Sequence, residues 1–93
     1  MTTYFKSRWI HDYEDQSIVS YHELDEDRFE QRLVEIFADG RVLRTAKFHP
    51  EALISLSNEP TPSLEEIRED PEFTVWEIDA DQFETVWARA ADA

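Results

Sequence analysis

The chain has 93 residues, and its 22 acidic side chains outnumber its nine Lys and Arg, which gives a formal net charge of −13. This charge excludes a generic nucleic-acid-binding surface, because binding to phosphates needs clustered basic side chains. The absence of cysteine excludes a disulfide-stapled scaffold and a thiolate metal site. Three Trp, three Tyr and six Phe still supply apolar surface for one modest core, so residues 1–93 are expected to form a single domain.

Alternating apolar and polar residues in the first half predict three β-strands, at Tyr4–His11, Ser17–Leu24 and Phe29–Ala38. The first two strands are expected to pair as a hairpin with a longer polar loop. In the simplest register of that hairpin, His22 lies opposite Ser7.

An Asp-Gly pair at positions 39–40 is the strongest turn signal of the chain. Such a pair between β-rich segments favours a two-residue type I′ turn, since glycine tolerates a positive φ. The turn then sets the register of a central hairpin, which pairs Phe37 with Val42, Glu35 with Arg44, and Leu33 with Ala46. The Glu35–Arg44 pair would be a stabilising cross-strand ion pair.

The second half begins with a proline-interrupted stretch, in which residues 52–56 fit either a short strand or a helical turn. Ser63 and Glu66 then have the spacing of a capping box, which predicts the start of a helix. Pro71 ends that helix near Asp70, so it must be short.

A strand is predicted at Thr74–Ile78, and Asp79 follows as the N-cap of a C-terminal helix. The apolar stripe of this helix has helical spacing and consists of Phe83, Val86, Trp87 and Ala90. The elements together predict an α+β domain: an antiparallel sheet of four to five strands with a central Asp-Gly hairpin, one short helix, and a C-terminal amphipathic helix packed on one face. We expect the helices to gather toward one side of the sheet.

The negative charge is concentrated in the second half. Residues 1–47 hold ten acids and seven bases, net −3, whereas residues 48–93 hold twelve acids and two bases, net −10. Two dense acidic segments stand out, at Glu23–Glu30 and Glu65–Glu72. Their acids are candidates for contact with a basic partner.

Catalytic and metal-binding motifs are absent from the sequence. The single glycine is assigned to the turn, so no glycine-rich phosphate loop and no nucleophile elbow can be built. The three histidines lack metal-ligand spacing. A calcium loop starting at Asp25 would need glycine where Glu30 stands and glutamate where Ile36 stands. We therefore expect no catalytic residues, no metal site and no cofactor.

Several short motifs resemble a family of small, acidic, functionally uncharacterised bacterial domains. The resemblance covers nearly the whole chain and rests on Trp9-x-His11-Asp12, Tyr21-x-Glu23-Leu24-Asp25, Glu30-x-Arg32-x-Val34-Glu35-x-Phe37-x-Asp39-Gly40-Arg41, Pro62-Ser63-Leu64-Glu65-Glu66-Ile67 and Asp70-Pro71-Glu72-Phe73. It supports one coherent fold and implies no particular activity.

Two functions follow from these patterns. The first is a small acidic module that binds a basic protein stoichiometrically, as an inhibitor or immunity-type protein against a bacterial toxin or nucleic-acid enzyme. Its expected binding residues are acidic: Glu23, Asp25, Glu26, Asp27, Glu65, Glu66 and Glu69. The alternative is a small-ligand-binding or enzymatic domain that uses polar residues on the sheet, namely His11, Tyr21, Glu23, Arg32 and Glu35.

The start of the chain has no apolar run of signal-peptide length, so a cytoplasmic location is expected, with no membrane or direct nucleic-acid contact.

Overall fold

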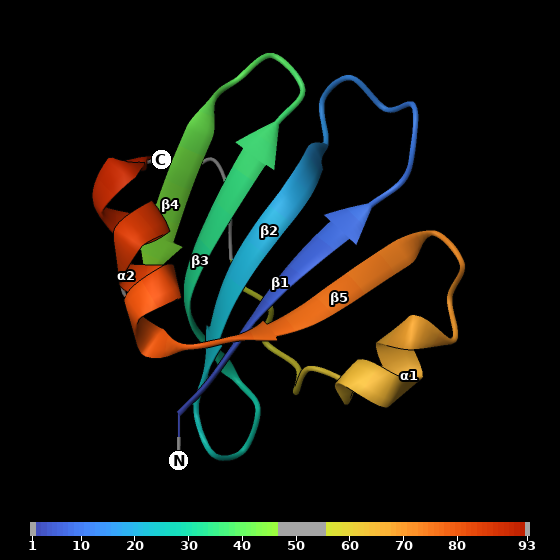
Figure 1. Ribbon diagram of the computed structural model, residues 1–93, viewed down its shortest axis with the longest axis vertical. Coiled ribbons are helices and arrows are strands. Elements are labelled where there is room, and N and C mark those ends of the chain that lie inside the picture. The colour runs from blue at the N-terminus through green and yellow to red at the C-terminus, as the bar shows by residue number, and fades with distance from the viewer. Residues whose placement is uncertain (1, 47–55, 93) are drawn as a thin grey trace.

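The computed structural model describes residues 2–46 and 56–92, and most of the segment whose structure the sequence left open lies outside this range. Five strands form an antiparallel sheet in the order β5-β1-β2-β3-β4, and a two-residue β6 pairs parallel to β4 (Figure 1). The elements are β1 (Thr3–Trp9), β2 (Ser17–Leu24), β3 (Glu30–Phe37), β4 (Val42–Ala46), α1 (Leu64–Arg68), β5 (Phe73–Ile78), α2 (Ala80–Arg89) and β6 (Ala91–Asp92). The prediction of a small α+β fold is confirmed.

The register of the first hairpin differs from the expected one. Phe5, and not Ser7, lies opposite His22, while Ser7 pairs with Ser20. The difference arises because the loop is centred between Tyr13 and Glu14, one residue earlier than in the simplest arrangement. Ser7 and His22 become diagonal neighbours on one face of the sheet, close enough for their side chains to meet.

The turn between β3 and β4 contains three residues instead of two. The Gly40 amide donates to the Phe37 carbonyl at 3.0 Å, and the Phe37 amide donates to the Arg41 carbonyl at 2.9 Å. Gly40 has a φ of 93°, whereas Asp39 has no positive φ, so the turn is not type I′. It has the hydrogen bonds of a type I turn followed by a glycine bulge, which needs a left-handed conformation at the glycine alone.

The predicted register of that hairpin is therefore wrong by one residue. Glu35 pairs with Leu43, and Arg44 pairs with Val34. A shift of one residue places two side chains on opposite faces of a sheet. Glu35 and Arg44 consequently do not form the expected cross-strand ion pair.

The two helices lie against opposite faces of the sheet. Leu64 and Ile67 of α1 pack against a core cluster that contains Phe5, while Phe83 of α2 packs against a cluster that includes Tyr4. Tyr4 and Phe5 are neighbours in β1, so their side chains point to opposite faces. The expectation that the helices gather toward one side of the sheet is therefore wrong. Because neighbouring strand residues are apolar, both faces of the sheet are apolar, and each face is covered by one helix.

Both helices begin at the predicted caps. The Ser63 side chain accepts from the Glu66 amide at 3.2 Å, and Asp79 and Gln82 form a complete capping box. At the other end of α1, Arg68 Nη2 donates to the Val75 carbonyl at 3.3 Å. This contact ties α1 to the outermost strand, β5.

Candidate functional site

Arg28 joins the loop between β2 and β3 to the segment that leads into α1. Its main-chain carbonyl accepts from the Thr61 amide at 2.8 Å, Nε donates to the Thr61 carbonyl at 2.8 Å, and Nη2 donates to the Pro62 carbonyl at 2.7 Å. The residue holds a left-handed conformation, with a φ of 69°. Two acidic segments that are far apart in the sequence are thereby held at the same end of the molecule.

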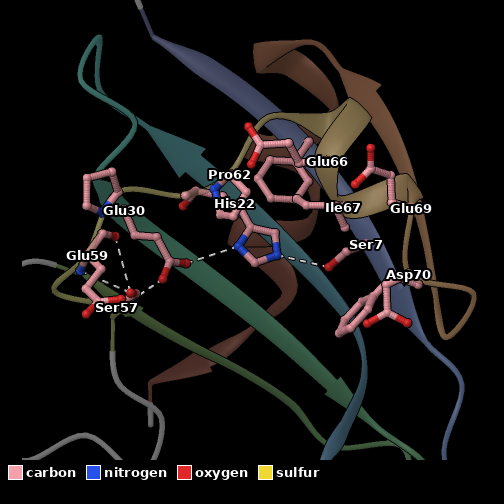
Figure 2. A pocket seen from close by; sticks show the side chains of 14 residues that line it. Ser7, His22, Glu30, Ser57, Glu59, Pro62, Glu66, Ile67, Glu69 and Asp70 are labelled. Atoms are coloured by element: carbon pink, nitrogen blue, oxygen red, sulfur yellow. Dashed lines mark hydrogen bonds and ion pairs between the residues drawn. The ribbon is translucent and has the colours of Figure 1, made fainter.

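A cavity of about 620 Å³ lies between the sheet and α1, on the face opposite α2 (Figure 2). Phe5, Phe73 and Ile67 supply apolar lining. Its carboxylates come from four parts of the fold and are Glu30, Glu59, Glu66, Glu69 and Asp70. The described residues that line the cavity include no Lys or Arg, so the cavity suits a positively charged group.

Three polar side chains in this cavity form a hydrogen-bonded row. Ser7 Oγ lies 3.0 Å from His22 Nε2, and His22 Nδ1 lies 3.0 Å from Glu30 Oε2. The Phe5 ring stacks on the imidazole with centroids 4.1 Å apart and planes at 5°. The other carboxylate oxygen of Glu30 accepts from the Ser57 amide at 2.8 Å, which fixes the end of the row (Figure 2).

Glu35 lies on the same face of the sheet as His22 and Glu30. Burial is the main reason that the pKa of Glu35 is raised, and the charge of Glu30 adds to the rise. The charge of His22 and a hydrogen bond to Ser17 act in the opposite direction. Glu35 therefore lies in a partly buried position on the face of the sheet that holds His22 and Glu30.

The expected acidic residues of the β2–β3 loop differ in their surroundings. Asp25 is half-buried and shapes the loop, since its Oδ1 accepts from the amides of Asp27 at 3.0 Å and Phe29 at 2.9 Å. Glu26 and Asp27 are exposed beside it. Glu23 lies apart from them, on the other face of the sheet, in an ion pair.

The expected acidic residues of α1 are all exposed. Glu66 and Glu69 line the cavity, whereas Glu65 does not. Glu66 also accepts a hydrogen bond from the Ser63 hydroxyl at 3.2 Å, so its carboxylate orients the side chain that caps the helix. Glu65 and Glu69 have no such contact in the described structure.

The five polar residues expected for a ligand site are not brought together. His11 lies in the β1–β2 loop, where Nε2 is 2.8 Å from the Ser17 carbonyl. Tyr21 lines a second cavity of about 510 Å³, between the sheet and α2. Glu23 and Arg32 form an ion pair on that α2 side, and Glu35 lies on the opposite face.

The Glu23–Arg32 pair connects the sheet to α2. Arg32 Nη2 and Nε donate to the two Glu23 carboxylate oxygens at 2.6 and 2.8 Å, and the guanidinium also pairs with Glu84. It lies 4.8 Å from the Phe83 ring centroid and 4.9 Å from that of Trp87. The hydrogen bond with Glu23, and then that with Glu84, raises the pKa of Arg32, and Arg32 lowers the pKa of Glu84. Through these contacts Arg32 holds α2 against the sheet.

The row of Ser7, His22 and Glu30 was not expected from the sequence. Its members come from three different strands, so no fixed spacing marks them, and such arrangements are recognised by geometry. The sequence feature that could have indicated part of this row is the alternation of side chains along a strand, which places Ser7 on the same face as Phe5 and His22 on the same face as Leu24. The predicted register already placed His22 beside Ser7, but nothing in the sequence marked the contact between His22 and Glu30.

The structure defines the class of the protein as a small α+β sheet domain with an acidic cavity on one face. Residues 3–92 match the family described as "Domain of unknown function (DUF6881)", and the chain belongs to this family. No curated protein and no solved structure matches the chain. Within residues 2–46 and 56–92, no helix has the length and apolar character needed to cross a membrane.

Proposed function

We propose that the chain is a cytoplasmic protein-binding module that recognises a basic partner through the acidic surface around the cavity. Binding would be stoichiometric, as for an inhibitor or an immunity-type protein, and the partner would be a bacterial toxin or nucleic-acid enzyme. The supporting observation is the Arg28 bridge, which holds the acidic β2–β3 loop beside the acidic start of α1. A basic surface meeting this end would contact both segments at once.

Electrostatics give the arrangement its functional value. Carboxylates lining a concave site raise the local concentration of a positively charged partner, and steering of this kind increases association rates by about 10–10³. General solubility is the rival explanation of a net charge of −13. The two explanations differ in one respect: steering depends on where the charges lie, and solubility does not.

A comparison of two charge reversals separates these explanations. The site variant combines Asp27→Lys, Glu65→Lys and Glu69→Lys, all at exposed positions in the two acidic segments that Arg28 connects. The control combines three reversals to Lys in the exposed β1–β2 loop, at Asp12, Glu14 and Asp15. This loop lies at the other end of the sheet (Figure 1). Both variants change the net charge by the same amount.

The partner is first captured with the whole chain from its native host at low salt, and its association rate is then measured with each variant. We expect one basic protein at near-equal stoichiometry, binding that weakens steeply with salt, and an association rate reduced about tenfold or more by the site variant alone. Equal rates for the site and control variants would refute the acidic interface. Failure to capture a basic protein would refute the proposed partner.

A further inference from the structure

We propose that Ser7 is a catalytic nucleophile, activated by His22 and Glu30, that hydrolyses small esters carrying a positively charged group. The order of contacting atoms is the first argument. In serine hydrolases the hydroxyl contacts Nε2 of a histidine whose Nδ1 is held by a carboxylate. Here Ser7 Oγ, His22 Nε2, His22 Nδ1 and Glu30 Oε2 follow one another in that order, with both contacts at 3.0 Å.

The three side chains are also held in place and partly removed from water. Phe5 stacks flat against the His22 ring, and the Ser57 amide fixes the Glu30 carboxylate. The side chains of His22 and Glu30 are 17% and 8% exposed. A hydrogen bond between a ring nitrogen and a carboxylate is stronger in such surroundings than in water. The row therefore has the preorganisation that a general base requires.

The cavity selects the class of substrate. Its volume of about 620 Å³ suits a small molecule. The lining carboxylates attract a cation, and the Phe73 ring, which is only partly buried, provides an aromatic surface that a quaternary ammonium can contact. A substrate with an ester group near Ser7 and an ammonium group toward the acidic rim satisfies both features.

The reaction proceeds by acyl transfer in two halves. Ser7 Oγ attacks the ester carbonyl carbon while its proton moves to His22 Nε2, and the bond to the leaving alcohol breaks as His22 returns that proton to the alcohol oxygen. Water then attacks the acylated serine, with His22 accepting and returning a proton, and the carboxylic acid leaves. Glu30 holds Nδ1–H and stabilises the imidazolium in both halves.

The rate is limited by the position of Ser7 in the sheet. β1 is an interior strand between β2 and β5, so its main-chain amides are used in pairing and do not face the cavity as oxyanion donors. Loss of even one such donor costs about 10²–10³ in rate in hydrolases that possess them. Slow turnover is therefore expected, and covalent labelling of Ser7 is the more sensitive measurement.

The first experiment treats the full chain with two fluorophosphonates of equal size, one bearing a trimethylammonium group and one bearing a neutral tert-butyl group. Intact-mass and peptide analysis should find a single adduct on Ser7, formed about tenfold faster with the cationic probe. Ser7→Ala should abolish labelling and Glu30→Gln should slow it at least tenfold. Ser20→Ala, at the position paired with Ser7, should label as the wild type does.

A second experiment uses the fact that the chain has no cysteine. Ser7→Cys introduces a single thiol beside His22, and its alkylation by iodoacetamide should be at least tenfold faster than in the Ser7→Cys/His22→Gln double variant. Trp fluorescence and circular dichroism verify folding in each case. Absence of a Ser7 adduct in the folded wild type, or equal alkylation of the two cysteine variants, would show that the row is only structural. Equal labelling by the two fluorophosphonates would refute the cationic substrate.

Discussion

Replacement of Arg32 by methionine tests whether one guanidinium holds α2 on the sheet. Methionine keeps the length and apolar stem of the side chain and removes its charge. The change leaves the Glu23 carboxylate, which is 13% exposed, without its bidentate partner. It also removes the contacts of the guanidinium with the Phe83 and Trp87 rings.

The size of the effect follows from those contacts. The charge-assisted bidentate pair with Glu23 contributes about 1.5–3 kcal/mol. Stacking over the two rings adds about 0.5–1 kcal/mol each. Glu84 is half-exposed, so its pair with Arg32 adds less than about 1 kcal/mol. Because methionine recovers some of the packing, we expect Arg32→Met to lower the free energy of unfolding by about 3 kcal/mol, and the Tm by about 12–24 °C.

Urea unfolding followed by circular dichroism and by Trp fluorescence measures this loss. Arg41→Met is the matched control, because Arg41 pairs with Asp39 and stacks 4.7 Å from the Phe37 ring in an exposed turn, and its effect should be much smaller. The double variant Arg32→Met/Glu23→Gln should regain part of the stability, since no buried carboxylate is stranded. If Arg32→Met lowers the free energy of unfolding by less than about 1 kcal/mol, or if the effects of the two substitutions simply add in the double variant, Arg32 does not hold α2 on the sheet.

Three further changes have defined outcomes. Gly40→Ala should cost about 1–2 kcal/mol in urea unfolding because Gly40 has a positive φ, and an unchanged stability would show that the turn adapts. Asp79→Ala should cost about 1 kcal/mol by removing the cap of α2, and Asp79→Asn should retain most of the stability. Burial raises the pKa of Glu35 in the folded protein. Glu35 therefore contributes favourably to folding stability in acid, below the ordinary pKa of a carboxyl group, and this contribution is lost as the pH rises through the raised pKa. Glu35→Gln should therefore raise the Tm at pH 7 and lose this advantage in acid. Thermal unfolding of the variant and the wild type at pH 7 and in acid measures this, and a Tm difference that is the same in both conditions would contradict it.

Features set by neighbouring residues could be predicted from the sequence. Strand alternation located the three N-terminal strands within a few residues, and the helix caps at Ser63 and Asp79 were placed correctly. Capping depends on a side chain and an amide three residues apart, so its signal is contained in the sequence.

Features set by register and by tertiary packing could not be predicted in the same way. Asp39-Gly40 is compatible with both a two-residue turn and a three-residue turn, and the choice changes the β4 partner of every β3 residue, Glu35 included. The amphipathic pattern of α2 shows that one of its sides is buried, but it does not say which face of the sheet covers it. The row of Ser7, His22 and Glu30 depends on side-chain contacts across three strands, which no local spacing marks.

The contact between Arg68 and the Val75 carbonyl has a consequence for self-association. β5 is the outermost strand at its side of the sheet, and an outer strand with free main-chain groups is a template on which another chain can add a strand. Arg68 engages one of those groups and brings a positive charge and the bulk of α1 next to the strand. A strand that added at Val75 would meet Arg68 and α1, so this contact disfavours strand addition at that part of the edge.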